Sequence, residues 1–228
     1  MGDISRLIPS NTPKYNSYSF LYPPRPETKN KIYPMQIPSW EARGFWAQYK
    51  KNGTNNVMAI SPDRQITARE RRNIPHVMWT PSEHTRLPFL GLKGGWYVFS
   101  CELIHSKVAG GASKGLRDIN YIHDILVADN AHLTGTTFAQ RQEMLAVLFD
   151  APNLPIAASG SHYVIDAHTW LARNHTKGFA KMFAGLSGAE DEGLVLKSPT
   201  AKLVSCAKEG LNASWMVKVR VPHGNYAA

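Results

Sequence analysis

The prolines of the first 38 residues set the strongest limit on how this chain can fold. Proline fixes φ and has no backbone N–H, so a segment rich in proline forms neither a regular helix nor a central strand. Tyrosines and lysines stand between these prolines, which are Pro9, Pro13, Pro23, Pro24, Pro26, Pro34 and Pro38. We therefore expect residues 1–38 to form an extended arm and residues 39–228 to form the folded domain.

The predicted arm is basic. Its cations are Arg6, Lys14, Arg25, Lys29 and Lys31, whereas its acids are Asp3 and Glu27. An extended basic segment can follow a groove or a duplex and bind phosphates without reading sequence. The arm can equally pack on the domain as a strap that only stabilises it, and the sequence leaves both roles open.

Runs of aromatic and β-branched residues predict the strands of the domain. These runs are FWAQYK from Phe45, NNVMAIS from Asn55, WYVFSCELI over 96–104, NYIHDILVA over 120–128, GLVLKS over 193–198 and SWMVKVRV over 214–221. Helical spacing predicts a helix over 138–149, capped by Thr136 or Thr137, and a second helix over about 169–186. The order predicts an α+β fold of mostly antiparallel sheets with inserted helices.

Charge and cysteine content narrow the function classes. The chain has 26 Lys and Arg against 17 Asp and Glu, a formal net charge of +9. This excess favours nucleic acid as a partner, then an anionic membrane, although a basic protein can also lack both. Two cysteines exclude a disulfide scaffold. No apolar run is long enough to span a membrane, and the polar N-terminus is unlike a signal peptide, so we expect a cytoplasmic protein without a membrane partner.

A pair of lysines stands at a predicted turn. Lys50 and Lys51 precede Asn52-Gly53, which is a tight-turn signal between two predicted strands. An ordinary hairpin explains this pattern fully. A lysine at the end of such a strand becomes a nucleophile only if burial or neighbouring cations lower its pKa.

The last two predicted strands supply candidate partners. Lys218 and Arg220 are two residues apart, so they share one face of a strand. Cations between apolar residues on a half-buried strand suit an oriented phosphate site. Glu192 and Lys197 are five residues apart, so we expect them on opposite faces of a regular strand.

Taken in order, these segments resemble the motifs of the covalent nucleotidyltransferases, which comprise ATP-dependent DNA ligases, RNA ligases and messenger-RNA capping guanylyltransferases. The first motif of that family is a lysine, any residue, Asp or Asn, and then Gly. The segment Lys50 to Gly53 fits it, and Gly53 selects Lys50 over Lys51. The second motif is similar to Arg69 in ITARERR, and the third is similar to Phe99 to Glu102.

The later motifs carry the resemblance further. After the third motif the family has an Asp-Ile-Leu stretch, Leu-Thr and an Arg-containing helix, which resemble residues 121–145 here. The fourth motif is matched letter for letter by EGLVLK over 192–197, and the fifth by Trp215, Lys218 and Arg220. The resemblance covers about residues 40–221. It implies the ATP-grasp-like adenylation domain of a ligase.

The resemblance also implies a mechanism. Lys50 attacks the α-phosphate of ATP, pyrophosphate leaves, and AMP passes from the lysine to a 5′-phosphate end of a nucleic acid. A neighbouring 3′-hydroxyl then releases AMP. Lys218 and Arg220 would lower the pKa of Lys50 and stabilise the phosphoryl oxygens, and Lys197 would contact the α-phosphate. Glu192, with Glu102, would bind Mg²⁺, or Mn²⁺ in its place.

Further residues are implied as nucleotide ligands. Glu102 would accept from a ribose hydroxyl. Gln48 and the carbonyl of Tyr49 would read the adenine edge. The arginine expected after the first motif is Asn55 here, and the aromatic expected to stack on the base is His123. Arg69, which corresponds to the second motif, is also implied as a nucleotide ligand.

The remaining expectations concern the reaction and its partners. The first function that we expect is the sealing of nicks in DNA, because the segment from Asp124 to Leu145 is more typical of DNA ligases. The alternative is an RNA ligase, which the string Gly53-Thr54-Asn55 favours. A capping guanylyltransferase and a non-catalytic nucleic-acid-binding module rank lower. Eight residues follow Arg220, too few for the OB-fold domain usual in DNA ligases. We therefore expect a monomer that binds nicked duplex, with the arm or a partner protein replacing that domain; such brevity is typical of viral and phage ligases.

Overall fold

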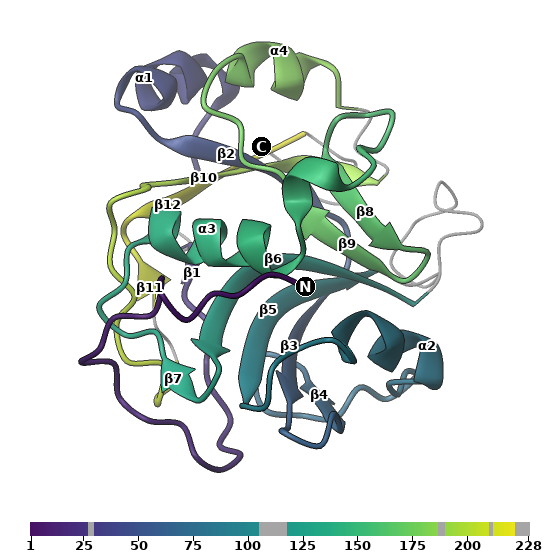
Figure 1. Cartoon of the computed structure of the whole chain (residues 1–228). Helices are drawn as coiled ribbons and strands as arrows, with labels where there is room; N and C mark the ends of the chain where they lie inside the picture. Colours follow the sequence, from purple (N-terminus) through teal and green to yellow (C-terminus); the bar gives the residue numbers. More distant parts are fainter. Residues whose placement is uncertain (27–29, 105–117, 187–189, 210–211, 222–228) are drawn as a thin grey trace.

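Two β-sheets of unequal size form the centre of the protein. The computed structural model describes residues 1–26, 30–104, 118–186, 190–209 and 212–221. The small sheet has the order β12 (Met216–Arg220), β10 (Asp191–Lys197), β2 (Trp46–Lys51), and all its pairs are antiparallel. Figure 1 shows this sheet above the larger one.

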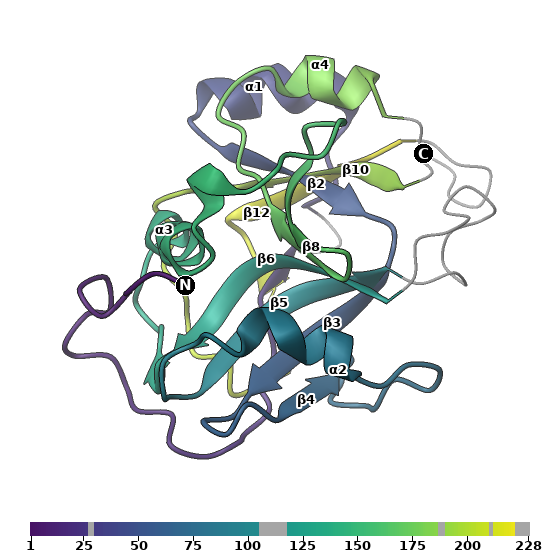
Figure 2. The same ribbon diagram turned by 45° about the vertical axis from the view of Figure 1, so that its right-hand side comes forward.

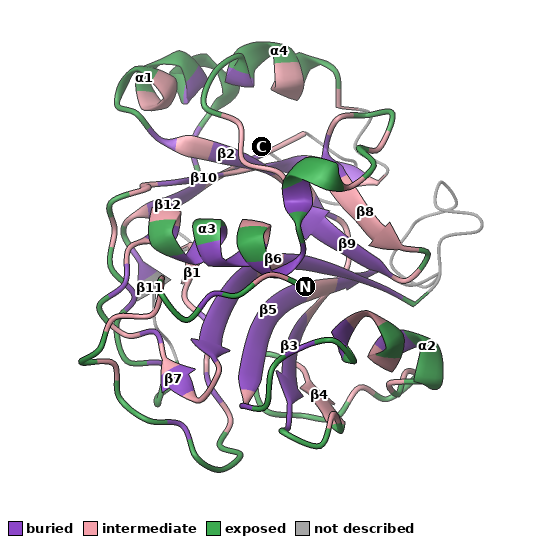
Figure 3. Ribbon diagram, viewed as in Figure 1, coloured by how far each residue is buried: buried purple, intermediate pink, exposed green. Residues whose placement is uncertain are grey.

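The large sheet contains the strands of the middle of the chain. Its order is β4 (Ile66–Arg69), β3 (Thr54–Ile60), β5 (Tyr97–Ile104), β6 (Ile119–Ala128), β9 (Thr169–Ala172) and β8 (His162–Asp166), with β7 (Ala131–His132) paired to β6. Only the β6–β9 pair of this sheet is parallel. The predicted α+β class with mostly antiparallel sheets is therefore confirmed. Figure 3 shows that β3, β5 and β6 are buried along most of their length.

Two helices cover the small sheet, and a third lies between the two sheets. α1 (Ile37–Ala42) and α4 (Phe179–Ala184) lie over the small sheet, where Ile37 and Phe179 pack with Leu194 and Leu196. α3 (Phe138–Leu148) packs on β6 through Met144 and other buried residues. The short helix α2 (Glu83–Arg86) and 3₁₀ turns over Pro34–Gln36, Leu87–Phe89 and Ala151–Asn153 complete the set in the described ranges. No helix among the described residues is long and apolar enough to cross a membrane.

The helix predicted over 138–149 is confirmed, with Thr137 as its N-cap. The Thr137 hydroxyl accepts from the Gln140 backbone N–H, and the Gln140 side chain accepts from the Thr137 N–H. The second predicted helix is wrong over most of its length. Residues Thr169–Ala172 form β9, because Trp170 packs in one apolar cluster and Leu171 in another. A strand buried on both faces has no polar side to reveal its period.

The arm lies along the domain in mostly extended form, but the predicted boundary at residue 38 is too late, because residues 34–38 form a 3₁₀ turn and the first residues of α1. Ile4, Tyr15 and Leu21 are buried in the core of the large sheet, and Ile32 is buried under the small sheet. Arg25 and Pro26 form the short strand β1, which pairs in parallel with β11 (Asn212–Ala213). Figure 1 shows this segment in purple, running around the edge of the large sheet and up to α1.

The turn at Asn52-Gly53 does not make a hairpin. β2 belongs to the small sheet and β3 to the large one, so the chain changes sheet between Lys51 and Thr54. Figure 2 shows the chain leaving β2 and descending into β3. A Cβ on Gly53 would lie 2.6 Å from the carbonyl oxygen of Leu103 and 2.7 Å from Cγ of Glu102. Glycine is therefore needed here for the close approach of the crossing chain to β5.

The close approach at Gly53 predicts that one added methyl group at this position lowers the stability of the protein. Gly53→Ala should lower the free energy of unfolding by about 1–3 kcal/mol, the usual effect of overpacking, as measured by urea unfolding. Gly94→Ala is the matched control, because no atom lies within 4 Å of the added methyl; its effect should stay within about 0.5 kcal/mol. Equal effects of the two substitutions would contradict the close-approach explanation.

Candidate active site between the two sheets

A pocket of about 200 Å³ opens between the two sheets. Both sheets contribute side chains to its lining, and the arm closes part of its rim. Alternate residues of a strand share one face, which is why the lining residues of β10 and β12 occur in steps of two, whereas β2 contributes the consecutive residues 48–51. The residues that the argument below uses are Arg25, Gln48, Lys50, Asn55, Arg71, Glu102, His123, Val195, Lys197, Lys218 and Arg220.

Lys50 lies near the end of β2 with its ammonium group inside this pocket. Its Nζ contacts the carboxylate of Glu192, which also accepts from Arg220 at 3.3 Å. Burial lowers the pKa of Lys50 to about 8; Glu102 opposes this shift, whereas Arg220 and Lys218 add to it. The two cations expected to act on Lys50 do so, but burial contributes more than either. A lysine with this pKa is deprotonated far more often at neutral pH than an ordinary one.

Lys51 has a different environment. Its side chain is fully buried, and its Nζ pairs with Glu190 at 2.6 Å and Asp191 at 2.9 Å. Ser161 accepts from the same ammonium group at 3.2 Å. These partners hold Lys51 as a structural cation beside the sheet crossing. Lys50 and Lys51 therefore differ in environment as well as in register.

Glu192 contacts the pocket residue Lys50 because β10 is irregular at that point. Lys50 pairs with Gly193 and Lys51 pairs with Asp191, so Glu192 is an extra residue in the strand. Such a bulge redirects one side chain. The expectation that Glu192 and Lys197 lie on opposite faces of a regular strand is therefore wrong: both point toward pocket residues. The neighbouring glycine is also required, since a Cβ on Gly193 would lie 1.9 Å from the carbonyl oxygen of Val219.

Further charged side chains line the pocket. Lys218 and Arg220 line it from β12, as their spacing predicts, and Glu102 lines it from β5. Burial raises the pKa of Glu102, against the opposing effect of Lys50 and Arg71. Arg69 is not among the described residues that line the pocket, whereas Arg71 is. Arg69 and Arg71 are two residues apart in the string ARERR. The sequence therefore offered Arg71 as a candidate, but it did not distinguish Arg71 from Arg69.

A buried amide network forms another part of the pocket wall. Lys197 donates to Gln48 Oε1 at 2.6 Å, and Gln48 Nε2 donates to Asn174 Oδ1 at 2.9 Å and Gln142 Oε1 at 3.1 Å. Gln48 thus has protein partners on both ends of its amide. Burial lowers the pKa of Lys197 to about 8, opposed by Asp124. Tyr49 contributes through its backbone, whose carbonyl accepts from the Tyr121 hydroxyl at 3.2 Å.

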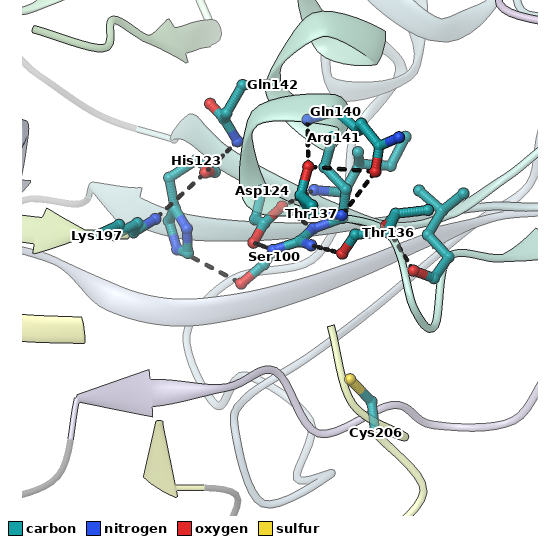
Figure 4. A network of polar contacts seen from close by, with 12 residues as sticks. Ser100, His123, Asp124, Thr136, Thr137, Gln140, Arg141, Gln142, Lys197 and Cys206 are labelled. Atoms are coloured by element: carbon teal, nitrogen blue, oxygen red, sulfur yellow. Dashed lines mark hydrogen bonds and ion pairs between the residues drawn. The ribbon is translucent and has the colours of Figure 1, made fainter. Parts of the chain in front are cut away.

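His123 stands on β6 between these groups (Figure 4). Its backbone carbonyl accepts from Gln142 at 3.2 Å, and its ring faces the Ser100 hydroxyl at 3.4 Å. Burial lowers the pKa of His123 to about 3, so the ring is neutral at physiological pH. The ring Nδ1 and the Asn55 Oδ1 are buried without a hydrogen-bond partner. Two such atoms beside one pocket suit a polar ligand.

A buried ion pair fixes the position of His123. Arg141 of α3 donates from Nε and Nη2 to the two carboxylate oxygens of Asp124, at 2.8 and 3.0 Å, and from Nη1 to the Thr136 carbonyl. Figure 4 shows this network beside His123. Burial alone opposes the charged carboxylate, but Arg141 outweighs it and lowers the pKa of Asp124. The sequence predicts the helix that contains Arg141; the partner of this arginine, Asp124, follows only from the fold.

The carboxylates of Glu102 and Glu192 are the candidates for a divalent metal. Lys50 interacts with both groups. Within the described residues, no group of three His, Cys, Asp or Glu side chains could hold a metal ion by itself. This donor set fits Mg²⁺, which is usually held by one or two carboxylates together with substrate phosphates. Mn²⁺ accepts the same oxygen ligands.

Comparison with known proteins identifies the fold. No known family model and no curated protein sequence matches the chain. The structure is similar to the ligase domain of M. tuberculosis LigD, with 16% identity and a TM-score of 0.56 over 78% of this chain and 54% of that one. It is also similar to a mycobacterial DNA ligase D in complex with ATP, with 15% identity and a TM-score of 0.50 over 78% of this chain and 55% of that one.

A phage enzyme gives the same result. The ATP-dependent DNA ligase of bacteriophage T7, in complex with ATP, has 14% identity and a TM-score of 0.50 over 83% of this chain and 66% of its own. The chain therefore spans about half the length of the two mycobacterial structures and about two thirds of the phage one. At these identities the likeness shows the fold, which is that of the nucleotidyltransferase domain of ATP-dependent DNA ligases.

The buried pair beside His123 yields a stability prediction. Arg141→Met leaves the Asp124 carboxylate buried without its partner, so it should lower the free energy of unfolding by about 3–5 kcal/mol. Arg86→Met removes an exposed pair with Glu83 on α2 and should cost less than about 1 kcal/mol. Chemical denaturation measures both values. A small effect of Arg141→Met would show that the pair is not what supports this wall of the pocket.

Proposed function

From this fold, we propose that the chain is an ATP-dependent polynucleotide ligase that seals nicks in DNA through a lysyl-AMP intermediate. The observation that carries the proposal is Lys50, a largely buried lysine with its pKa lowered to about 8, in a pocket that Lys218 and Arg220 also line. The similar mycobacterial and phage ligases are described in complex with ATP. That description supports a nucleotide as the ligand of the corresponding pocket here.

The first step uses Lys50 as the nucleophile. Its deprotonated Nζ attacks the α-phosphorus of ATP, a P–N bond forms, and the bond to the β-phosphate oxygen breaks, so that pyrophosphate leaves. The nitrogen loses its remaining extra proton to solvent. Lys218 and Arg220 offset the negative charge that grows on the phosphoryl oxygens. A bound divalent ion, held by Glu192 and Glu102, would supply further positive charge at these oxygens.

The lining of the pocket favours one orientation of the nucleotide. The neutral ring of His123 and the side chain of Val195 offer flat and apolar surfaces for a base. Lys197 donates to Gln48, and these polar groups can give the base an edge to pair with. Lys50 and Arg220, which both contact Glu192, suit the phosphates. We assign the ribose to Glu102.

The later steps transfer AMP to a 5′-phosphate and then join that phosphate to a 3′-hydroxyl. The DNA assignment rests on the Asp124 to Leu145 segment, whose inner arginine makes the buried pair with Asp124. An RNA ligase is the second candidate, because Asn55 lines the pocket where DNA ligases have arginine. A capping guanylyltransferase and a binding module without activity have no such observation in their favour. Nicked duplex, with or without a partner protein, is the proposed substrate.

Adduct formation and nick sealing test the proposal directly. The wild-type protein, incubated with radiolabelled ATP and Mg²⁺, should form an acid-labile covalent adduct that peptide mapping assigns to Lys50. The same protein should seal a nick in DNA faster than nicks in RNA or in hybrid duplexes. Lys50→Arg keeps the charge but is not expected to form the adduct, because guanidinium is not deprotonated in proteins.

Each part of this experiment can fail separately. AMP on Lys51 would show that the lysine was misassigned. Sealing confined to RNA strands would favour the second candidate. No adduct with either ATP or GTP, in a protein that melts normally, would overturn the enzymatic assignment.

The groups around Lys50 yield a quantitative prediction. Glu192→Gln and Lys218→Met should each slow adduct formation at least ~100-fold, the scale of losing one electrostatic stabiliser in a transition state. Lys202→Met, which removes an exposed cation outside the pocket lining, is the control and should react at the wild-type rate. Single-turnover kinetics at saturating ATP measure the rates. Wild-type rates in both pocket variants would make these residues structural.

A further inference from the structure

The arm contributes its own cation to the pocket. Pro23, Pro24, Arg25 and Pro26 are part of the lining, from a segment that lies outside the motifs discussed above. Arg25 lies near Arg71 and Lys218, both of which respond to its charge. Lys31, further along the arm, also acts on Lys218. Cations from the arm, from the segment after β4 and from β12 therefore meet at one place.

The backbone holds Arg25 firmly at this place. Arg25 and Pro26 pair with Asn212 and Ala213 in the β1–β11 ladder. Five residues later, Asn30 donates to the carbonyl oxygens of Ala213 and Met216, at 3.2 and 3.1 Å, and the Ile32 N–H donates to the Lys218 carbonyl at 3.0 Å. The prolines on both sides of Arg25 restrict φ. The arm is thus fixed to β12, the strand that carries Lys218.

The pocket lining carries an excess of positive charge. Its cations include Arg25, Lys50, Arg71, Lys218 and Arg220, whereas the carboxylates that line it from the described residues are Glu102 and Asp124. Glu192 also pairs with Lys50 and Arg220. Loss of hydration lowers the pKa of Lys218, and the cations Arg220, Arg71 and Arg25 lower it further. Mutual repulsion of this kind is relieved by an anion of several charges. A single phosphate supplies less charge than a chain of phosphates does.

We propose that Arg25 of the arm, together with Arg71 and Lys218, binds the β- and γ-phosphates of the nucleoside triphosphate and holds the pyrophosphate as it leaves. This inference rests on the proposed function, because it assumes that the α-phosphate lies next to Lys50. A duplex is too wide to enter a pocket of about 200 Å³, whereas a phosphate chain is narrow enough to reach all three cations. The arm therefore discriminates a triphosphate from a monophosphate at this site.

Binding measurements separate the triphosphate from the monophosphate. Calorimetry on the full chain compares AMP with α,β-methylene-ATP, which cannot transfer its nucleotide to Lys50. Arg25→Met should weaken binding of the analogue about tenfold or more, the effect of losing one charge-assisted hydrogen bond, and leave AMP binding within about twofold. Arg6→Met, which removes an exposed arm cation outside the pocket lining, should change neither affinity.

Two additions make the outcome decisive. Arg25→Gln, which keeps polar contacts but removes the charge, replaces Arg25→Met if the latter lowers the melting temperature. Tripolyphosphate is the second probe, because it tests the phosphate site without a base or ribose. Its binding to the wild-type protein should also weaken in the Arg25 variants.

The remaining results would overturn the inference. Equal losses for AMP and the analogue, or no loss for either, exclude a role of Arg25 at the β- and γ-phosphates. A loss confined to binding of nicked DNA would assign the arm to nucleic acid instead. If tripolyphosphate binds through Arg25 but neither nucleotide binds, the proposed function fails while the polyphosphate site stands. If no probe binds the wild-type protein, both fail.

Discussion

The crossing of the chain from one sheet to the other at Gly53 is the constraint on which the site depends. Strand β2 ends in the small sheet, and β3 begins in the large one, with no room for a side chain at the crossing. Lys50 is therefore held by one sheet while facing Glu102 on the other. The salt bridges of the buried Lys51 stabilise the same crossing. A hairpin at this position would have left the lysines on an ordinary surface turn.

Burial sets the electrostatics of the pocket more than charge pairing does. It is the largest cause of the lowered pKa of Lys50, Lys197 and His123 and of the raised pKa of Glu102. Loss of hydration disfavours whichever form carries the charge. The pocket thus holds a lysine that gives up its proton more readily and a neutral imidazole. A ligand with several negative charges is the chemical complement of such a pocket.

The local part of this structure could be predicted, and the long-range part could not. Strands β2, β3, β5, β6, β10 and β12 and helix α3 match the runs that predicted them, because strand propensity and capping depend on neighbouring residues. The helix predicted over 169–186 is present only as α4, and the chain makes no hairpin at Asn52. In both places the tertiary structure decided. Trp170 and Leu171 have buried partners on two faces, and β2 finds its partner in β10, far along the sequence.

The sequence by itself determined which side chains share a face: Gln48 with Lys50, and Lys218 with Arg220, because a strand repeats every two residues. Only the tertiary structure decided which face became the pocket. It turned Glu192 toward Lys50 through a bulge, brought Arg71 rather than Arg69 to the rim, and brought Arg25 to Lys218 from the other end of the chain. Strand alternation is a property of the local backbone, whereas these meetings depend on the packing of distant segments.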